Sequence, residues 1–276
     1  MDSPKHIRCK SERPFVFRLD LDCDDIQNTM SMRHFHSILE CMRKLSVDDE
    51  CRSIVISSLG KDFCTGVNID NLERFNSEQA RIEDIARRGR SVDERVSIIQ
   101  RAFSAIENCP KPVIAAINGA CAGPGMGLIS ACDIRYCDAD SWFQVKELEL
   151  GIAADSGTLQ RLPKIMGNDS FTREMCYTAR RVDSDEALKY GLVSRVFDTR
   201  TQTLNYAMDM AERMALVSPV GLQNCKKSIV FSQHHSTQDG LDHIREINCL
   251  ARQCEDFHIS MGPAITGAER PNYAKY

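Results

Sequence analysis

Short apolar runs recur through the first two thirds of the chain at the spacing that strands require. Residues 14–21 (PFVFRLDL) alternate apolar and polar side chains, the period of a half-buried strand. Residues 53–58 and 111–117 are compact β-branched or small apolar runs that end at turn residues, as in strands buried on both faces. Two further short strands are predicted over residues 134–137 and 142–145.

Helical periodicity separates these strands. Residues 31–45 place apolar side chains every three or four positions, with Ser31 as the expected N-cap. Residues 77–108 have the same periodicity, which predicts a helix broken at Gly89, and residues 183–190 predict a short helix that precedes a strand over residues 192–196. The alternation of strands and helices is typical of an α/β fold.

The pattern changes near residue 201. Residues 204–216, 220–231 and 241–254 predict three amphipathic helices with no strand between them. We therefore expect a core over residues 1–200 and a C-terminal helical region and tail over residues 201–276, whose last part, residues 262–276, is expected to be loosely ordered.

Composition narrows the class of protein. The 276 residues are 42% hydrophobic and 27% charged with a net charge of -4, as in an ordinary soluble domain without attraction to nucleic acid. No signal-peptide core or membrane-spanning run is recognisable. The thirteen cysteines are irregularly spaced and many lie in apolar runs, which favours reduced core residues over a disulfide framework or a metal site.

Two acids stand out in residues 146–161 (KELELGIAADSGTLQR). Glu147 and Asp155 flank a stretch of small and apolar residues that could line a dry pocket, where a carboxyl pKa rises into the range useful for moving protons. The residues leave a plainer alternative open: Glu147 as an exposed acid at a strand end and Asp155 as the N-cap of the following helix.

Other candidate binding residues are weaker. Gly119, Gly123, Gly125 and Gly127 precede an apolar helix, where glycine lets the backbone approach a ligand, but the spacing is not that of a dinucleotide-binding loop. Two basic groups could meet phosphates or could simply be solvated: Arg87, Arg88 and Arg90, and Lys226 and Lys227.

Four segments together resemble the crotonase (enoyl-CoA hydratase/isomerase) superfamily. They are residues 28–31 (NTMS), 61–69 (KDFCTGVNI), 111–119 (KPVIAAING) and 157–163 (GTLQRLP). Residues 132–137 (CDIRYC), 143–147 (FQVKE) and 151–164 look like its Δ3,5-Δ2,4-dienoyl-CoA isomerase branch. The resemblance implies an α/β fold, a crotonase-like ββα spiral, with a C-terminal helical region that builds homotrimers, often paired into hexamers.

The same resemblance implies an activity: conversion of 3,5-dienoyl-CoA to 2,4-dienoyl-CoA in fatty acid β-oxidation. Asp155 would exchange the proton at C2 and Glu147 the proton at C6, and the amides of Val67 and Gly125 would form the oxyanion hole. Substrate-binding residues would be Thr65, Gly66, Val67, Asn68, Ile69 and Gly125. Acyl-CoA would be the only partner besides other copies of the chain, and no cofactor or metal is required. A mitochondrial or peroxisome-type location is expected, and the terminal AKY loosely resembles a peroxisomal address.

Two residues depart from the family pattern. Gly127 stands where hydratases carry a catalytic glutamate and dienoyl-CoA isomerases an aspartate, which argues against hydration. Pro124 stands where the second oxyanion N–H is expected, and proline has none. The alternatives are that Gly125 donates through a shifted register, that a water or side chain substitutes, or that the protein is a weakened or inactive acyl-CoA binder. The two departures could also be neutral changes in a loop.

Overall fold

The computed structural model describes residues 6–22 and 28–275. Its strands are β1 (Ile7–Arg13), β2 (Val16–Leu21), β3 (Ser53–Ser58), β4 (Val113–Ile117), β5 (Ala120–Ala122), β6 (Ile134–Asp138), β7 (Trp142–Gln144), β8 (Val182–Asp183) and β9 (Arg195–Phe197). Its helices are α1 (Met32–Ser46), α2 (Ile69–Ala80), α3 (Ile85–Glu107), α4 (Pro124–Ala131), α5 (Thr158–Ile165), α6 (Asp169–Thr178), α7 (Ser184–Lys189), α8 (Arg200–Ala215), α9 (Pro219–Ser232), α10 (Thr237–Ala251) and α11 (Glu255–Thr266), and a 3-10 helix spans Glu147–Leu150.

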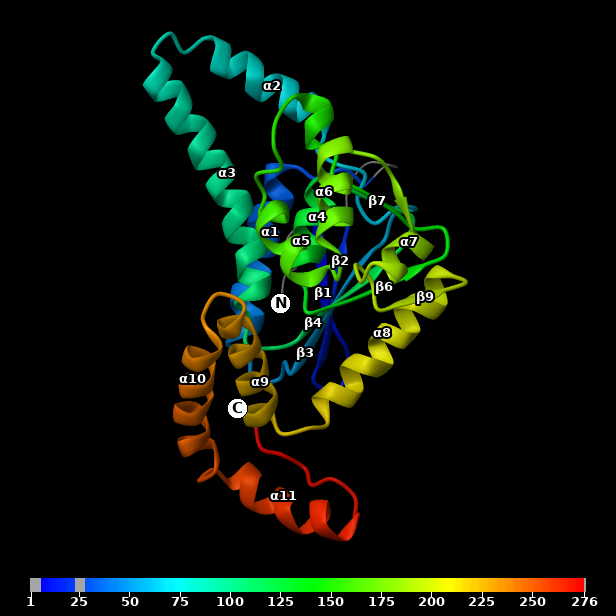
Figure 1. The fold of residues 1–276 in the computed structure, drawn as a ribbon, viewed down its shortest axis with the longest axis vertical. Coiled ribbons are helices and arrows are strands. Elements are labelled where there is room, and N and C mark those ends of the chain that lie inside the picture. The colour runs from blue at the N-terminus through cyan, green and yellow to red at the C-terminus, as the bar shows by residue number, and fades with distance from the viewer. Residues whose placement is uncertain (1–5, 23–27, 276) are drawn as a thin grey trace.

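The centre of the fold is a sheet in the order β1-β2-β3-β4-β6-β9 (Figure 1). Only β1 is antiparallel to its neighbour, and the other strands run parallel. Every residue of β3 and β4 is buried, as the continuous apolar runs predicted. A smaller sheet, β5-β7-β8, lies beside the glycine-rich segment.

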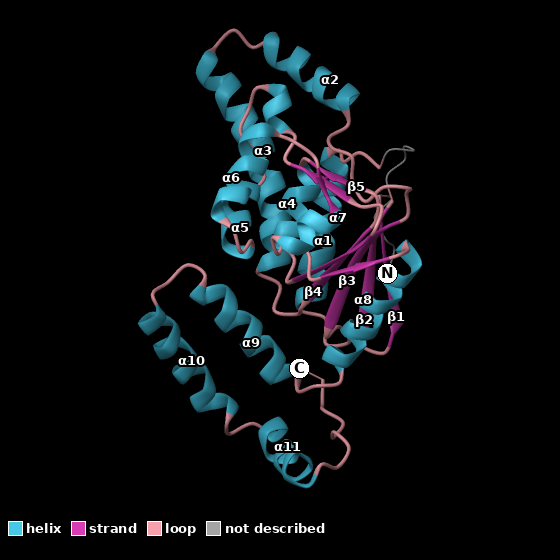
Figure 2. Ribbon diagram, turned by 45° about the vertical axis from the view of Figure 1, so that its right-hand side comes forward, coloured by secondary structure: helices cyan, strands magenta, loops and turns pink. Residues whose placement is uncertain are grey.

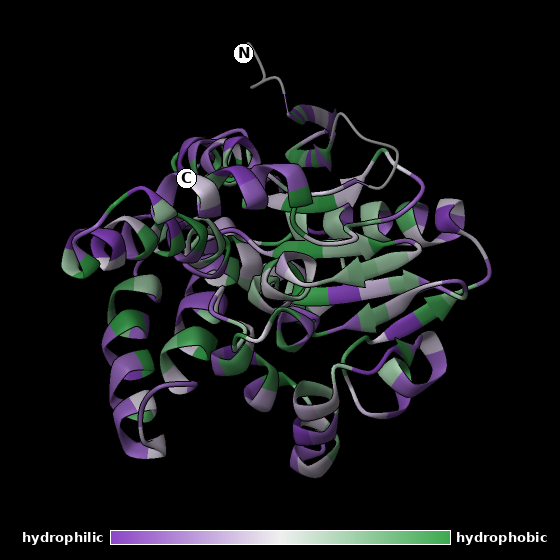
Figure 3. Ribbon diagram, turned by 90° about the horizontal axis from the view of Figure 1, so that it is seen from above, coloured by the Kyte–Doolittle hydropathy of each residue, from purple (hydrophilic) through white to green (hydrophobic). Residues whose placement is uncertain are grey.

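Helices cover both faces of the main sheet. The helix α8 packs on one face through Ala207 and Ala211, against Val55 and Ile114. The opposite face belongs to a larger core that includes residues of α1, α3 and α4. Figure 2 shows α8 lying along the strands, and Figure 3 shows hydrophobic residues concentrated on the central strands.

Two arms extend from this core (Figure 1). At one end α2 and the beginning of α3 project together, and at the other end α9, α10 and α11 follow one another away from the sheet. None of the helices in the described parts of the chain combines the length and apolar character that crossing a bilayer requires.

Several boundaries differ from the prediction. The helix expected over residues 77–108 is not broken at Gly89, which lies inside α3; the break falls at residues 81–84, where Asp84 caps α3 by accepting from the Arg87 amide. The strand β1 and the helices α6 and α11 were not predicted. The tail expected to be loosely ordered begins as a helix, since α11 extends to Thr266, and residues 268–275 have no helix or strand. The Arg52 guanidinium donates to the carbonyl oxygens of Tyr273 and Ala274 at 2.8 and 3.1 Å.

Lys226 is a structural residue, which removes it as a candidate phosphate ligand. Its ammonium group is buried, lies 2.7 Å from the Asp133 carboxylate, and donates to the carbonyl oxygens of Ile106 and Lys111 at 3.2 and 3.0 Å. Lys226 therefore holds α9 against the end of α3 and against the residues that precede β4 and β6.

Replacing Lys226 with alanine should destabilise the fold by about 3 kcal/mol, because the substitution leaves one charge of a largely buried pair without its partner. Thermal unfolding of the variant measures the loss. Lys227→Ala is the matched control, since Lys227 is exposed on the same helix and should change stability by less than about 0.5 kcal/mol. Equal losses in the two variants would contradict this role.

Candidate active site

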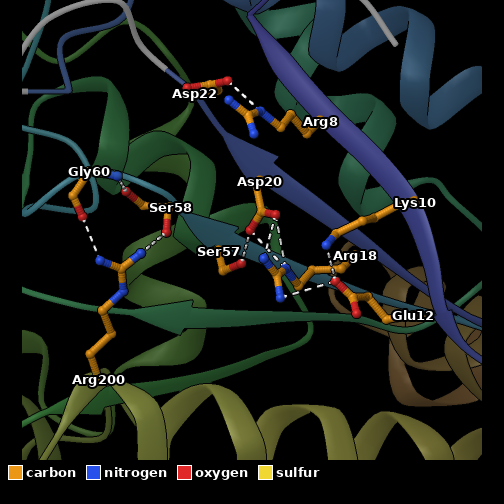
Figure 4. A network of polar contacts seen from close by, with 10 residues as sticks. All are labelled: Arg8, Lys10, Glu12, Arg18, Asp20, Asp22, Ser57, Ser58, Gly60 and Arg200. Atoms are coloured by element: carbon orange, nitrogen blue, oxygen red, sulfur yellow. Dashed lines mark hydrogen bonds and ion pairs between the residues drawn. The ribbon is translucent and has the colours of Figure 1, made fainter. Parts of the chain in front are cut away.

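A loop between β3 and α2 carries the first candidate oxyanion donor, and polar side chains hold it. Asn28 Nδ2 donates to the carbonyl oxygens of Asp62 and Phe63 at 3.1 and 2.6 Å, and Asn118 Nδ2 donates to that of Lys61 at 2.7 Å. Figure 4 shows the Arg200 guanidinium reaching the carbonyls of Ser58 and Gly60 at the start of this loop. The loop is fixed from several elements at once.

The amide of Val67 is left available by this arrangement. The Met30 amide donates to Gly66 O at 2.9 Å and the Asn68 amide donates to Met30 O at 3.0 Å, in a parallel bridge between Met30 and Val67. In such a bridge the N–H of Val67 points away from Met30. Gly66 has φ 134°, a conformation that favours glycine.

The helix α4 begins beside this loop. Gly123 has φ 54° and its amide donates to Gln144 O at 3.1 Å, and the first helical amide bound to Gly123 O is that of Met126, at 2.9 Å. Pro124 is the first helical residue and has no N–H, a position that suits proline. No backbone carbonyl in the described part of the chain is recorded as accepting from the Gly125 amide, which leaves this N–H at the helix N-terminus.

Gly123 is the point where the parts of the site meet. A Cβ atom built on Gly123 would lie 3.7 Å from the Gly66 Cα and 3.9 Å from Glu147 Oε1. The loop ending at Val67, the start of α4 and the Glu147 carboxyl are therefore neighbours, although 80 residues separate Gly66 from Glu147 in the sequence.

Glu147 is not the exposed acid of the plainer alternative. It opens the 3-10 helix, its side chain is half-buried, and its Oε2 is buried without a hydrogen-bond partner among the described residues. Burial raises the pKa of the Glu147 carboxyl, and the nearby charge of Asp155 raises this pKa further.

Asp155 is not a helix cap. The helix α5 begins at Thr158, and the residue before it, Gly157, has φ 100° and takes the cap position. The Asp155 carbonyl accepts from Gln100 Nε2 of α3 at 2.7 Å, which holds the loop. The Asp155 side chain is open to solvent at the edge of the site, yet partial burial of its carboxyl raises its pKa. Leu148, Leu150 and Ile152, which lie between the two acids in the sequence, are each 42 to 50% exposed and add apolar surface to this segment.

The remaining predicted binding residues have local roles as well. Asn68 caps α2, because its Oδ1 accepts from the Asn71 amide at 3.0 Å, and Ile69 begins α2 with its side chain 53% exposed. Thr65 lies in the loop before Gly66. Gly125 is closely packed, since a Cβ there would lie 2.9 Å from the Cys64 Cβ.

The three arginines predicted as a possible phosphate cluster do not act together. Arg88 donates to the Ile82 carbonyl and Arg90 pairs with Glu94 at 3.1 Å. A different basic group was not foreseen: a pocket of about 430 Å³ beside Thr29 and Asn68 is lined by Arg33, Arg74 and Arg95. These residues come from three helices with no common motif, so only the tertiary structure reveals the group.

The described cysteines are all free thiols, and those in apolar runs, such as Cys121, Cys132 and Cys176, are buried, as the sequence predicted for cysteines in such runs. Within residues 6–22 and 28–275 no three His, Cys, Asp or Glu side chains are grouped as metal ligands.

Comparison with known proteins places this geometry in a family. Residues 15–251 match the family model described as enoyl-CoA hydratase/isomerase. The chain belongs to the enoyl-CoA hydratase/isomerase family. Within that family it is 41% identical over 259 residues to the rat mitochondrial Δ(3,5)-Δ(2,4)-dienoyl-CoA isomerase, covering 94% of this chain and 79% of the rat protein. It is 35% identical to the peroxisomal Δ(3,5)-Δ(2,4)-dienoyl-CoA isomerase of Arabidopsis thaliana, covering 94% and 93% of the two chains.

The predicted fold class is confirmed by a solved structure of the same family. The enoyl-CoA hydratase from Bacillus anthracis superposes with a TM-score of 0.86 over 98% of this chain and 99% of that chain, at 24% identity. The chain therefore has the crotonase-type α/β fold of this enoyl-CoA hydratase/isomerase family.

Proposed function

We propose that this protein is an isomerase that converts 3,5-dienoyl-CoA to 2,4-dienoyl-CoA, as the names of its relatives describe. The observation that carries the proposal is the Glu147 carboxyl beside Gly66 and Gly123, together with the Asp155 carboxyl whose charge acts on it; the pKa of both acids is raised. Hydration is disfavoured, because Gly127 provides no second carboxylate on α4.

The environments of the two acids suggest their roles. Burial raises the pKa of both carboxyls, and the charge of Asp155 raises the pKa of Glu147 further, so we assign Glu147 as the acid and Asp155 as the base. Asp155 removes a proton from C2, the resulting negative charge moves to the thioester oxygen, and Glu147 delivers a proton to C6 as the double bonds move from positions 3 and 5 to positions 2 and 4. The amides of Val67 and Gly125 stabilise the enolate oxygen. These steps use no metal or redox cofactor.

The test is direct. Purified protein is mixed with 3,5-dienoyl-CoA, and the absorbance of the conjugated 2,4-dienoyl thioester is followed, with 2-enoyl-CoA as a hydration control. We expect conjugation without hydration. Absence of conjugation at micromolar protein would refute the isomerase and leave the second candidate, an inactive acyl-CoA binder, which the missing N–H of Pro124 favours.

We also propose that the pocket of Arg33, Arg74 and Arg95 receives the phosphates of CoA. The pocket adjoins Asn68, the residue after the proposed oxyanion donor. Glu78 also lines it and its charge acts on Arg95, whose guanidinium lies over the Phe75 ring, so the three arginines outnumber the single carboxylate in the pocket lining. Arginine suits this task because its planar fork binds phosphate oxygens.

Arg74→Ala should raise KM for dienoyl-CoA about 10-fold with kcat nearly unchanged, because the phosphates do not react. Steady-state kinetics measure both constants. Arg87→Ala, an exposed arginine outside the pocket, is the control and should change neither constant. A fall in kcat without a rise in KM would contradict the assignment.

The oligomer and the compartment are proposals too. Exposed apolar side chains on α10 and α11, such as Leu250 at 77% and Ile265 at 82%, support a homotrimer or hexamer built through the C-terminal helices. Sedimentation velocity should give a mass at least three times that of the chain, and a monomer would contradict it. A mitochondrial or peroxisomal location is proposed from the relatives' names.

A further inference from the structure

Gly127 leaves a space on α4 that another residue fills. A Cβ atom built on Gly127 would lie 2.5 Å from the hydroxyl oxygen of Ser156 and 2.8 and 3.1 Å from two ring carbons of Phe103. The distances of 2.5 Å to the Ser156 oxygen and 2.8 Å to the nearer Phe103 carbon are far below van der Waals contact. The first atom of any side chain at position 127 would therefore collide with Ser156 and Phe103.

The two neighbours differ in what they can do. Phe103 is a fully buried residue of α3, fixed by an edge-to-face contact with Phe35 at 5.8 Å between ring centroids. Ser156 is 3% exposed, and its hydroxyl has one recorded partner, Thr158 Oγ1, at 3.3 Å, which is long for such a bond. The polar atom in the space beside Gly127 is therefore the Ser156 hydroxyl.

Ser156 lies between two parts of the candidate site, the loop that carries Asp155 and the helix α4. Ser156 directly follows Asp155, whose carbonyl accepts from Gln100 of α3. Gly127 lies on α4, the helix that begins with Pro124 and Gly125. The contact of Ser156 with Gly127 thus fixes the Asp155 loop against the helix that carries the proposed oxyanion donor.

We infer that Ser156 is a positioning residue: its hydroxyl occupies the space that Gly127 leaves and sets Asp155 relative to the N-terminus of α4. This inference rests on the proposed isomerase reaction for its kinetic consequence, but not for its geometry. One space serves residues 127 and 156, and only one of them can place a side-chain atom there. The space that the missing side chain of residue 127 leaves is therefore occupied by the Ser156 side chain, which comes from another part of the chain.

The first experiment removes only the hydroxyl. Ser156→Ala should lower kcat about 10-fold or more with KM changed less than about two-fold, because misplacing a proton carrier slows the chemical step rather than binding. The matched control is Ser130→Ala: Ser130 is also a buried serine, on α4 itself, and its hydroxyl donates to Gly127 O at 2.9 Å on the helix's own backbone. This control should keep kcat within about two-fold.

A second measurement needs no turnover. The titration of the Asp155 carboxyl, followed by NMR, should move toward the ordinary value near 3.8 in Ser156→Ala and stay unchanged in Ser130→Ala, because a loosened loop exposes the carboxyl to water. If the wild-type protein fails to isomerise dienoyl-CoA, the proposed function is wrong, and this titration still decides the role of Ser156.

The shared space is tested by a double-mutant cycle. Gly127→Ala alone should lower Tm by roughly 3–10 °C, and the same substitution in the Ser156→Ala background should cost clearly less, because the contact with the hydroxyl is gone. Equal Tm losses in the two backgrounds, or a Ser156→Ala variant with wild-type kcat and wild-type Asp155 titration, would overturn the inference.

Discussion

Glu147→Gln should reduce kcat for dienoyl-CoA isomerisation by about 10²–10⁴-fold, the usual contribution of a general acid, and should at the same time raise the stability of the folded protein at neutral pH. The amide cannot deliver a proton to C6. It also removes a carboxylate whose Oε2 is buried without a partner in the described structure. Loss of activity together with a higher Tm separates a catalytic acid from a structural one.

The sign of the stability change follows from the pKa. Because the folded-state pKa of Glu147 is raised above its ordinary value of 4.5, its protonated form contributes stability that is fully present below pH 4.5 and is lost as pH rises through the raised pKa. The glutamine variant has no such loss. The Tm difference between variant and wild type should therefore grow from pH 4.5 upward and then level off.

Glu149→Gln is the matched control for this experiment. Glu149 lies on the same 3-10 helix, is 49% exposed, and its Oε1 accepts from Gln144 Nε2, a bond that a glutamine can keep. Its substitution should leave kcat within about two-fold. A Glu149→Gln variant as slow as Glu147→Gln would show that the turn, and not the buried carboxyl, matters.

Deuterium exchange distinguishes the two proton carriers. In D2O, Glu147→Gln should still exchange the C2 protons of the substrate, because Asp155 remains as a base, while Asp155→Asn should lose both exchange and isomerisation. If Asp155→Asn still exchanges the C2 protons and Glu147→Gln does not, then Glu147 is the base at C2 and Asp155 the acid at C6.

The strand pattern was predictable where burial is continuous. Strands β3, β4 and β6 are buried nearly throughout, so their apolar runs mark them in the sequence. The strand β1 escaped prediction because it lies at the sheet edge and its middle is polar (Arg8, Lys10, Ser11 and Glu12). Gly89 does not end the helix, because one glycine in a helix interior costs only about 1 kcal/mol relative to alanine and α3 continues for 18 residues beyond it.

The candidate acids were predictable, but their setting was not. The apolar surroundings of Glu147 and Asp155 are visible in the sequence, whereas the exclusion of Asp155 as the cap of α5 depends on Gly157, which takes the cap position with φ 100°. Residues brought together from distant segments, such as Gly127 with Ser156 or Arg33 with Arg74 and Arg95, carry no local signal at all. Tertiary packing alone defines them.

The second large effect concerns the enolate oxygen. If Gly125 supplies the second donor, replacing its amide N–H by an ester oxygen, through incorporation of glycolic acid at this position, should lower kcat by about 10²–10³-fold. The exchange adds no side-chain atom, which matters because a Cβ at Gly125 would lie 2.9 Å from the Cys64 Cβ and any ordinary substitution would disturb the packing.

The variant Pro124→Gly tests the alternative donor, because it restores an N–H at the position where the family pattern expects one. With Gly125 as donor, this variant should change kcat by less than about three-fold and should lower Tm, since proline is favourable as the first residue of a helix. If instead Pro124→Gly raises kcat about 10²-fold or more while the Gly125 ester has no effect, the wild-type site lacks its second donor and Pro124 weakens the enzyme. Steady-state rates of these two variants therefore show which of two successive peptide bonds, 123–124 or 124–125, supplies the second donor.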